Sequence, residues 1–247
     1  MKIIAPKTIK IRLYLTLTLF IIFSGLIAGT YIVNRFDSVR ASLDDNVIQN
    51  TVIIDAGHGG PDGGTSSDDG ILEKDINLQI ATKLNDILNS MGVKTVMTRS
   101  EDVSIHNNTA KTIREKKISD IKNRLEIMNK TENSIFVSIH QNHFSVSKYN
   151  GTQVFYSKNN PLSQSLANCI RQSVISYLQP ENSREIKESG SEIYLLYHAQ
   201  QPSVMVECGF LSNSDETQKL KDEMYQKKLA FLIAVGIFDY FKNTEEN

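Results

Sequence analysis

A chain of 247 residues is long enough for one large domain or two small ones. With 40% hydrophobic and 22% charged residues, its composition is that of an ordinary globular protein. Four of the 27 basic residues precede Leu13, so the remaining 23 stand against 28 acidic residues, a formal charge of −5. A mildly acidic chain without a basic stripe argues against nucleic acid as a partner.

The N-terminal part of the chain is predicted to anchor it in a membrane. A basic segment, residues 1–12, precedes an uncharged apolar run over residues 13–33. About 20 helical residues cross a bilayer, so the run is long enough for a signal anchor. A cleaved signal peptide is the alternative, although Ala28 and Gly29 form a poor cleavage site. The basic segment is expected to stay in the cytoplasm, and residues 34–50 are expected to link the anchor to an external domain.

Beyond Thr51, β-branched runs alternate with apolar residues at helical spacing. Strands are predicted over residues 51–55, 93–98, 134–140, 152–156 and 203–207. Helices are predicted over residues 73–91, 117–130, 161–178 and 215–241. This alternation predicts one α/β domain over residues 51–243, with three layers and a mostly parallel sheet covered by helices on both faces.

Three candidate functional residues follow or end predicted strands, namely His58, His140 and Glu207. Ligands bind at the carboxyl ends of the strands in such sheets, so these residues are expected to lie near one another. His58 lies in a loop with five glycines, "IIDAGHGGPDGG". A phosphate site is disfavoured there, because no helix opens directly after the glycines and Asp62 lies among them.

A metal site is the other interpretation of this loop. His58, Glu73 and His140 offer two nitrogens and one carboxylate, which matches a catalytic zinc site with its fourth position open. The residues do not form the helical H-E-x-x-H pair. Their spacing alone therefore leaves His58 open to a second interpretation, as a polar surface residue.

Five segments occur in the order "IDAGHGGPDGG", "LEKDINLQIA", "MTRSED", "IFVSIHQN" and "VMVECGFLSN", over about residues 51–242. Together they resemble the zinc-dependent N-acetylmuramoyl-L-alanine amidases of the amidase 3 family. The resemblance implies a three-layer α/β fold of the phosphorylase/hydrolase type. It also implies that His58, Glu73 and His140 bind one Zn²⁺ ion and that Glu207 is the catalytic carboxylate.

The activity implied by this resemblance is hydrolysis of the amide bond between N-acetylmuramic acid and L-alanine in peptidoglycan. A zinc peptidase acting on stem peptides is one alternative. A catalytically silent wall-binding or scaffold protein is another, disfavoured because all four chemical residues are present.

The architecture, one anchor and one catalytic domain, most resembles the germination-specific or spore-cortex members of the family. It implies action outside the cytoplasmic membrane, in the spore intermembrane space or cortex, or secretion if the anchor is cleaved. It further implies removal of stem peptides for a partner deacetylase that forms muramic-δ-lactam. Some family members are also held inactive until an activator protein binds them.

Several residues near the motifs have weaker predicted roles. Asn142 and His143 are expected to contact substrate, and His143 departs from the small residue that the family usually has there. A role for His143 in metal binding is an alternative. Arg99 and Arg124 are expected to form ion pairs that hold helices to the sheet.

The remaining singled-out residues are expected to be structural. Cys208 is predicted to face away from Glu207, because neighbouring side chains along a strand point to opposite faces. Cys169 and Cys208 are expected to be free thiols, with a bridge as the alternative. His106 and His198 have no motif support. The polar and basic segment 104–118 is predicted to be a mobile surface for a partner.

Overall fold

The computed structural model describes Thr16 and residues 50–245. The chain divides into two compact units, Met1–Asp44 and Asp45–Asn247, and the fold described here is that of the second unit. The predicted basic segment, the anchor over residues 13–33 apart from Thr16, and the linker apart from its last residue lie outside the described residues. Within the described part of the chain, no helix is long and apolar enough to cross a membrane.

Six strands form one mixed sheet, in the order β2-β1-β3-β6-β4-β5. Their bounds are β1 Thr51–Ala56, β2 Thr95–Met97, β3 Ser134–Asn142, β4 Gln153–Tyr156, β5 Lys187–Glu188 and β6 Ser203–Phe210. The strands β2, β1, β3 and β6 are parallel. The pair β4 and β5 runs the opposite way, because β4 is antiparallel to β6. The predicted mostly parallel sheet is confirmed, with a reversed edge.

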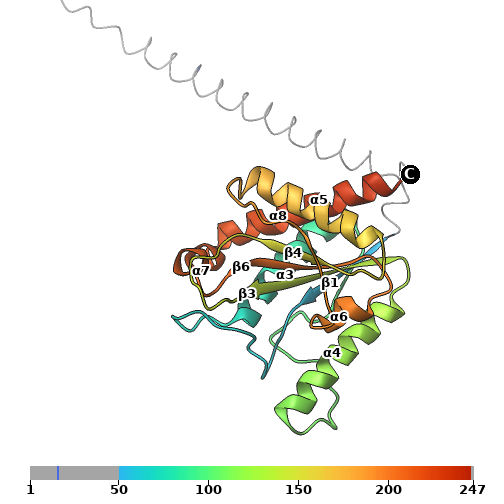
Figure 1. The fold of residues 1–247 in the computed structure, drawn as a ribbon. Coiled ribbons are helices and arrows are strands. Elements are labelled where there is room, and N and C mark those ends of the chain that lie inside the picture. The colour runs from blue at the N-terminus through green and yellow to red at the C-terminus, as the bar shows by residue number, and fades with distance from the viewer. Residues whose placement is uncertain (1–15, 17–49, 246–247) are drawn as a thin grey trace, which may run out of the picture. The chain divides into compact units, whose positions relative to one another are not determined.

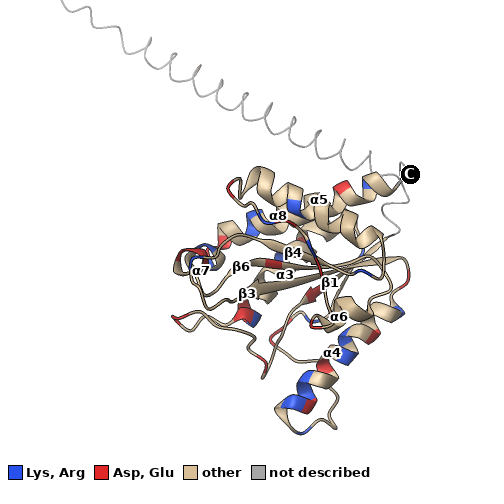
Figure 2. Ribbon diagram, in the orientation of Figure 1, with Lys and Arg blue, Asp and Glu red and all other residues tan. Residues whose placement is uncertain are grey.

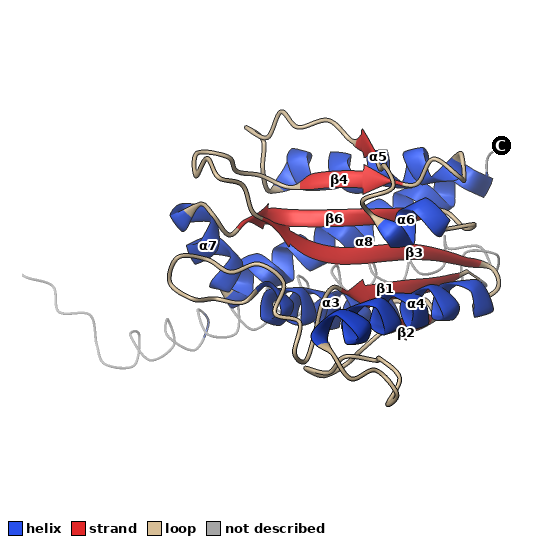
Figure 3. Cartoon of the chain, turned by 60° about the horizontal axis from the view of Figure 1, so that its bottom comes forward, coloured by secondary structure: helices blue, strands red, loops and turns tan. Residues whose placement is uncertain are grey.

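Helices cover both faces of this sheet (Figures 1 and 3). One face packs against α3 (Glu73–Ser90), α5 (Leu162–Tyr177) and α8 (Glu223–Glu245). The other face lies under α4 (Ile113–Lys130) and α6 (Tyr194–His198), and α7 (Ser214–Lys221) leads from β6 into α8. The three-layer α/β arrangement expected from the sequence is therefore present in the described residues.

The α4/α6 face has its own apolar core. The core residues of this cluster come from three strands, two helices and the residue that follows α6, and they are Ile53, Met128, Phe136, Leu195, Leu196, Ala199 and Met205. Side chains two residues apart along a strand share a face. Asp55, His140 and Glu207 are therefore on the α4/α6 face, which places the candidate site on that side of the sheet.

Some predicted boundaries were wrong for local reasons. The helix expected from residue 117 begins at Ile113, because Thr112 and Glu115 form a capping box that starts it one turn earlier. The single helix expected over residues 215–241 is split into α7 and α8 at Asp222. The short elements β5 and α6 were not predicted.

The segment 104–118, predicted to be a mobile surface for a partner, includes the first residues of α4. Residues from Ile113 onward belong to α4, along which Lys and Arg positions recur (Figure 2). The preceding loop is held to the helix, because Ser104 Oγ and the Ile105 amide both donate to Asp120 Oδ1, at 2.8 and 2.7 Å. These hydrogen bonds join the loop to α4. Its mobility and its role as a partner surface remain predictions.

Candidate metal centre

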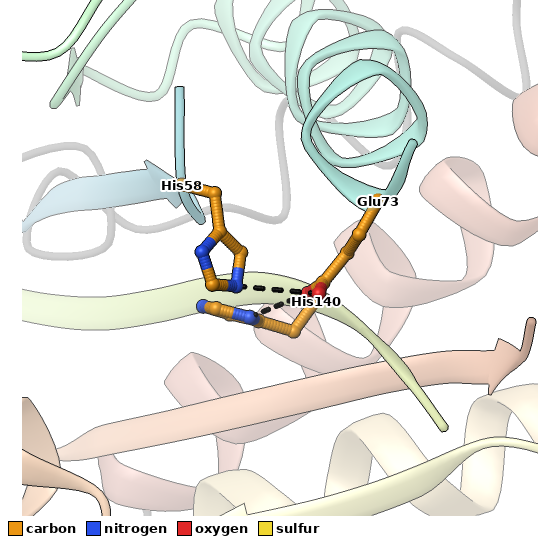
Figure 4. A group of neighbouring side chains, drawn as sticks. All are labelled: His58, Glu73 and His140. Carbon is orange, nitrogen blue, oxygen red and sulfur yellow. Dashed lines mark hydrogen bonds and ion pairs between the residues drawn. The ribbon is translucent and has the colours of Figure 1, made fainter. Parts of the chain in front are cut away.

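Three predicted ligands converge on the α4/α6 side of the sheet (Figure 4). His58 follows β1, Glu73 opens α3 and His140 lies in β3, and one ligand atom from each lies within 4.8 Å of the other two. Glu73 joins the two rings, with Oε2 3.2 Å from His58 Nε2 and Oε1 2.8 Å from His140 Nδ1. The fold therefore brings together the three side chains that the family resemblance singled out.

The carboxylate of Glu73 is held firmly in this position. The backbone N–H groups of Thr65 and Gln141 donate to its Oε2 and Oε1, at 2.9 and 3.1 Å. Burial alone would raise the pKa of Glu73, but hydrogen bonds from His140 and His58 hold it well below its usual range. Glu73 is therefore an anion at neutral pH, as a metal ligand must be.

His58 is oriented by a second carboxylate, Asp62. Its Nδ1 lies 2.9 Å from Asp62 Oδ2, and Lys117 Nζ contacts the other Asp62 oxygen at 2.7 Å. Burial would lower the pKa of His58, but hydrogen bonds to Asp62 and Glu73 raise it to about 9. A carboxylate on one ring nitrogen fixes the ring so that the other nitrogen faces the ligand group. From the sequence, Asp62 served only as an argument against a phosphate site, and its contact with His58 was not predicted.

The glycines of the loop give the ligands room. A Cβ on Gly57 would lie 2.2 Å from His140 Nε2, and one on Gly64 would lie 2.5 Å from Glu73 Oε2. His58 itself has a φ of 62°, a left-handed conformation that non-glycine residues adopt at an energetic cost. The glycine-rich loop is thus built for close approach to two side chains of the candidate metal site.

Two buried arginines hold the backbone of this loop. Arg99 Nε and Nη2 donate to the carbonyl oxygens of Ala56 and Gly57, at 2.8 and 3.0 Å. Arg124 Nη1 and Nη2 donate to the carbonyl oxygens of Ala56 and His58, at 2.8 and 2.7 Å. The two guanidinium groups therefore bind three consecutive peptide carbonyls.

The ion pairs expected of these arginines are found for Arg124 alone. It contacts Asp55 at 2.5 Å and Asp120 at 2.6 Å. The Asp55 carboxylate is fully buried, and although burial would raise its pKa, Arg124 and neighbouring groups lower it to about 2. Arg99 has no ion pair with any described residue and instead uses backbone acceptors.

Glu207 lies on β6, in register with His140 on β3. Burial raises its pKa to about 7, despite the opposing charge of His140. Its Oε2 is buried and has no hydrogen-bond partner among the described residues. Buried polar atoms are normally paired, so this unpartnered carboxylate oxygen beside two histidines and Glu73 fits a site that receives a metal and its water. The donor set itself, two histidines and a carboxylate, is one that zinc prefers.

An open cleft of about 350 Å³ leads to this centre from the α4/α6 side. Its lining includes His58 and His140, Lys117 of α4 and Tyr194 of α6. A substrate can therefore reach the ligand group from the side of the sheet that carries Glu207.

The residues with weaker predicted roles lie in different places. Asn142 lines a second groove beyond β6, whereas His143 is exposed and lies outside the ligand group found among the described residues. His198 packs against the rings of Tyr194 and Tyr197, as a structural residue would.

The two cysteines were expected to be free thiols, and this is confirmed. Both are free thiols, so the alternative of a Cys169–Cys208 bridge was wrong. Cys208 is fully buried. Its side chain alternates with that of Glu207 along β6, which places it in the core on the α3/α5/α8 side.

Comparison with known proteins matches the family suggested by the motifs. Residues 52–239 match the model of the Amidase_3 family, described as N-acetylmuramoyl-L-alanine amidase. The germination-specific N-acetylmuramoyl-L-alanine amidase of Bacillus subtilis is 33% identical over 77% of this chain and 79% of its own.

Two solved structures have the same fold. The CwlD amidase from Clostridioides difficile, in complex with the GerS lipoprotein, is 43% identical over 78% of this chain and 98% of its own, with a TM-score of 0.76. The amidase AmiC2 of Nostoc punctiforme is 30% identical over 78% of this chain and 97% of its own, with a TM-score of 0.67. The chain therefore belongs to the Amidase_3 family of N-acetylmuramoyl-L-alanine amidases.

Proposed function

We propose that this chain hydrolyses the amide bond between N-acetylmuramic acid and L-alanine in peptidoglycan, using a zinc ion held by His58, Glu73 and His140. The observation that carries the proposal is the convergence of these three side chains beside Glu207 Oε2, a buried oxygen without a hydrogen-bond partner among the described residues. When bound, zinc would polarise the amide carbonyl and lower the pKa of water at the site.

The protein's own groups then have separate tasks. Glu207 Oε2 accepts a proton from the attacking water and delivers it to the departing nitrogen of L-alanine. A pKa of about 7 suits both steps, because the group can gain and lose a proton near neutral pH. Asp62 keeps the His58 ring turned towards the ligand group, and Arg99 and Arg124 keep its backbone in place.

The physiological substrate that we propose is spore-cortex peptidoglycan. The germination-specific relative in Bacillus subtilis supports this assignment. The chain would remove stem peptides so that a partner deacetylase can form muramic-δ-lactam. A deletion strain is then expected to sporulate but to lack this lactam in its cortex, and a normal lactam content would contradict the assignment.

The placement and partner of the domain are also part of this proposal. Residues 13–33 would anchor the catalytic domain, residues 51–243, outside the cytoplasmic membrane, or the domain would be secreted if that segment is cut. The CwlD amidase was solved with a lipoprotein, which supports a lipoprotein partner for this chain, and we expect such a partner to act as an activator. Copurification of such a partner, and higher turnover when it is added, are the expected results.

The central experiment incubates the zinc-loaded chain with purified peptidoglycan and identifies the products by mass spectrometry. Stem peptides that begin with L-alanine are expected from the wild type and not from Glu207→Gln. Glu126→Gln is the matched control, because that carboxylate is exposed on α4 and should leave turnover unchanged. Shortened stem peptides would favour a zinc peptidase. Zinc binding without any product, even when the lipoprotein partner is added, would favour a silent wall-binding protein.

A further inference from the structure

We propose that a groove on the β4–β5 side of Glu207 binds the stem peptide of the substrate through its carboxylates, with Arg184 and Lys187 as the cationic contacts. This inference rests on the amidase function proposed above. The groove, here called the basic groove, has a volume of about 280 Å³. Its lining includes Asn142, Tyr149, Gln153, Arg184, Lys187 and Phe210.

The basic groove begins one strand beyond the proposed catalytic carboxylate. His140 on β3 is in register with Glu207 on β6, and Glu207 is in register with Gln153 on β4. Register partners project from the same face, and neighbouring strands lie about 4.8 Å apart. Gln153 lines the groove, so the row of three residues runs from the metal centre directly into it.

A second register pair shows the same continuity. Met205 lines the cleft beside the metal centre, and its partner on β4, Phe155, lines the basic groove. The cleft and the groove therefore lie on opposite sides of β6 and on one face of the sheet. A substrate that crosses Glu207 would extend one arm into each.

The two sides differ in charge. The cleft lining contains four carboxylates and two cations besides its histidines, and these are Asp55, Asp62, Asp120, Glu192, Lys117 and Arg124. The basic groove contains Arg184 and Lys187 and no carboxylate in its lining. In the described part of the chain, no salt bridge joins either cation to an acidic group.

Arg184 is held in a position from which it can bind an anion. Its guanidinium lies 4.5 Å from the ring centroid of Phe210 and 5.6 Å from that of Tyr149. Its Nε donates to the carbonyl of Asn150 at 2.8 Å. Stacking and one hydrogen bond orient the planar fork, while its Nη groups remain available to a carboxylate. Lys187 is exposed on β5 and adds a second, more adjustable cation.

The chemistry of the scissile amide indicates which half of the substrate lies in the cleft and which half lies in the basic groove. The acyl arm carries a sugar, which is neutral apart from its attachments, and the amine arm is a peptide with free carboxylates. Glu207 must deliver its proton to the departing peptide nitrogen, so the peptide arm leaves from the side of Glu207. The groove next to Glu207 is the cationic one, which matches the acidic arm, and the cleft then receives the sugar.

The test compares synthetic muramoyl peptides whose stem carboxylates are either free or converted to amides. With the full zinc-loaded chain in detergent, amidation is expected to lower kcat/KM about tenfold or more, mainly through KM, since a charge-assisted pair is worth about 1.5–3 kcal/mol. In Lys187→Gln and Arg184→Gln this preference should shrink by about tenfold. Lys228→Gln, an exposed lysine on α8, is the control and should retain it.

A binding measurement separates this inference from the proposed function. Calorimetry of the free stem peptide with the full chain is expected to show binding that weakens about tenfold in Lys187→Gln. Equal affinity of the wild type, Lys187→Gln and Arg184→Gln for the stem peptide would overturn the assignment of the groove. The absence of a preference for substrates with free carboxylates would overturn it too. Failure of the wild type to cleave any muramoyl-L-alanine amide would overturn the proposed function, while the peptide titration would still decide the groove. Lys187→Gln matters most here, because Arg184 also holds the neighbouring loop.

Discussion

Replacing Glu207 with Gln should change the pH dependence of folding stability as well as abolish turnover. Burial raises the pKa of this carboxyl from its ordinary 4.5 to about 7 in the metal-free protein. The folded state therefore binds a proton more tightly than the unfolded state does. The stability contributed by this proton is fully present below about pH 4.5 and is lost as the pH rises through 7.

The size of the effect follows from the separation of the two pKa values. Each pH unit of separation is worth roughly 1.4 kcal/mol, so an ionised Glu207 costs the folded protein about 3 kcal/mol at pH 8. The Glu207 side chain is only partly accessible and its Oε2 is buried, so solvent screening reduces this figure little. A neutral Gln of similar shape does not titrate. Relative to the wild type, Glu207→Gln should gain about 3 kcal/mol of unfolding free energy between pH 4 and pH 8.

The assay is urea denaturation of both proteins in the presence of a chelator, at pH values from 4 to 8. The quantity of interest is how the difference in unfolding free energy between the two proteins changes with pH. Any constant cost of fitting an amide into the site cancels from this change. Glu126→Gln should show no such trend, because Glu126 is exposed. A difference between wild type and Glu207→Gln that stays constant across this pH range would refute the reasoning, and with it the buried charge as the source of the raised pKa.

Three further outcomes are expected. Gly57→Ala should abolish metal binding, measured by equilibrium dialysis, and turnover, measured by product assay, because its Cβ would overlap His140. Gly63→Ala in the same loop is the control and should retain both, because its Cβ would make only an ordinary contact. Arg124→Leu should lower the unfolding free energy by about 3–5 kcal/mol in urea titrations, since it leaves the buried Asp55 without its partner; a loss below 1 kcal/mol would contradict that. Dialysis against a chelator should remove turnover and added zinc should restore it, and full turnover of metal-free protein would exclude the metal site.

The sequence was most informative where side-chain patterns are periodic or fixed by a motif. Long strands and helices such as β3 and α3 were predicted within two residues of their observed bounds, because buried apolar residues impose the spacing. The convergence of His58, Glu73 and His140 could be expected from the order of five motifs. The direction of β4 and β5 could not, since a short strand looks the same in either orientation.

The contacts of the site that could not be predicted from the sequence share a physical reason. The bond between Asp62 and His58 and the contact of Lys117 with Asp62 depend on how a glycine loop folds back, and no periodicity encodes that. The arginines were noted, but ion pairs were expected where backbone carbonyls are the main acceptors of Arg99. The basic groove joins residues from β3, β4, β6 and the segment around β5, which meet only through the sheet order.

The attachment of the β1 loop to Arg124 makes the site and helix α4 one cooperative unit. Any local unfolding that withdraws this side chain removes the guanidinium donor to the His58 carbonyl and leaves Arg99 as the guanidinium donor to that of Ala56, so the His58 ligand loses backbone support at the same moment. Binding at the site and the stability of α4 are consequently coupled, and the coupling is reciprocal. Zinc should then slow amide hydrogen exchange throughout α4, a helix that contributes none of the proposed ligands, and a partner that steadies α4 from outside should raise the affinity for zinc by the same factor.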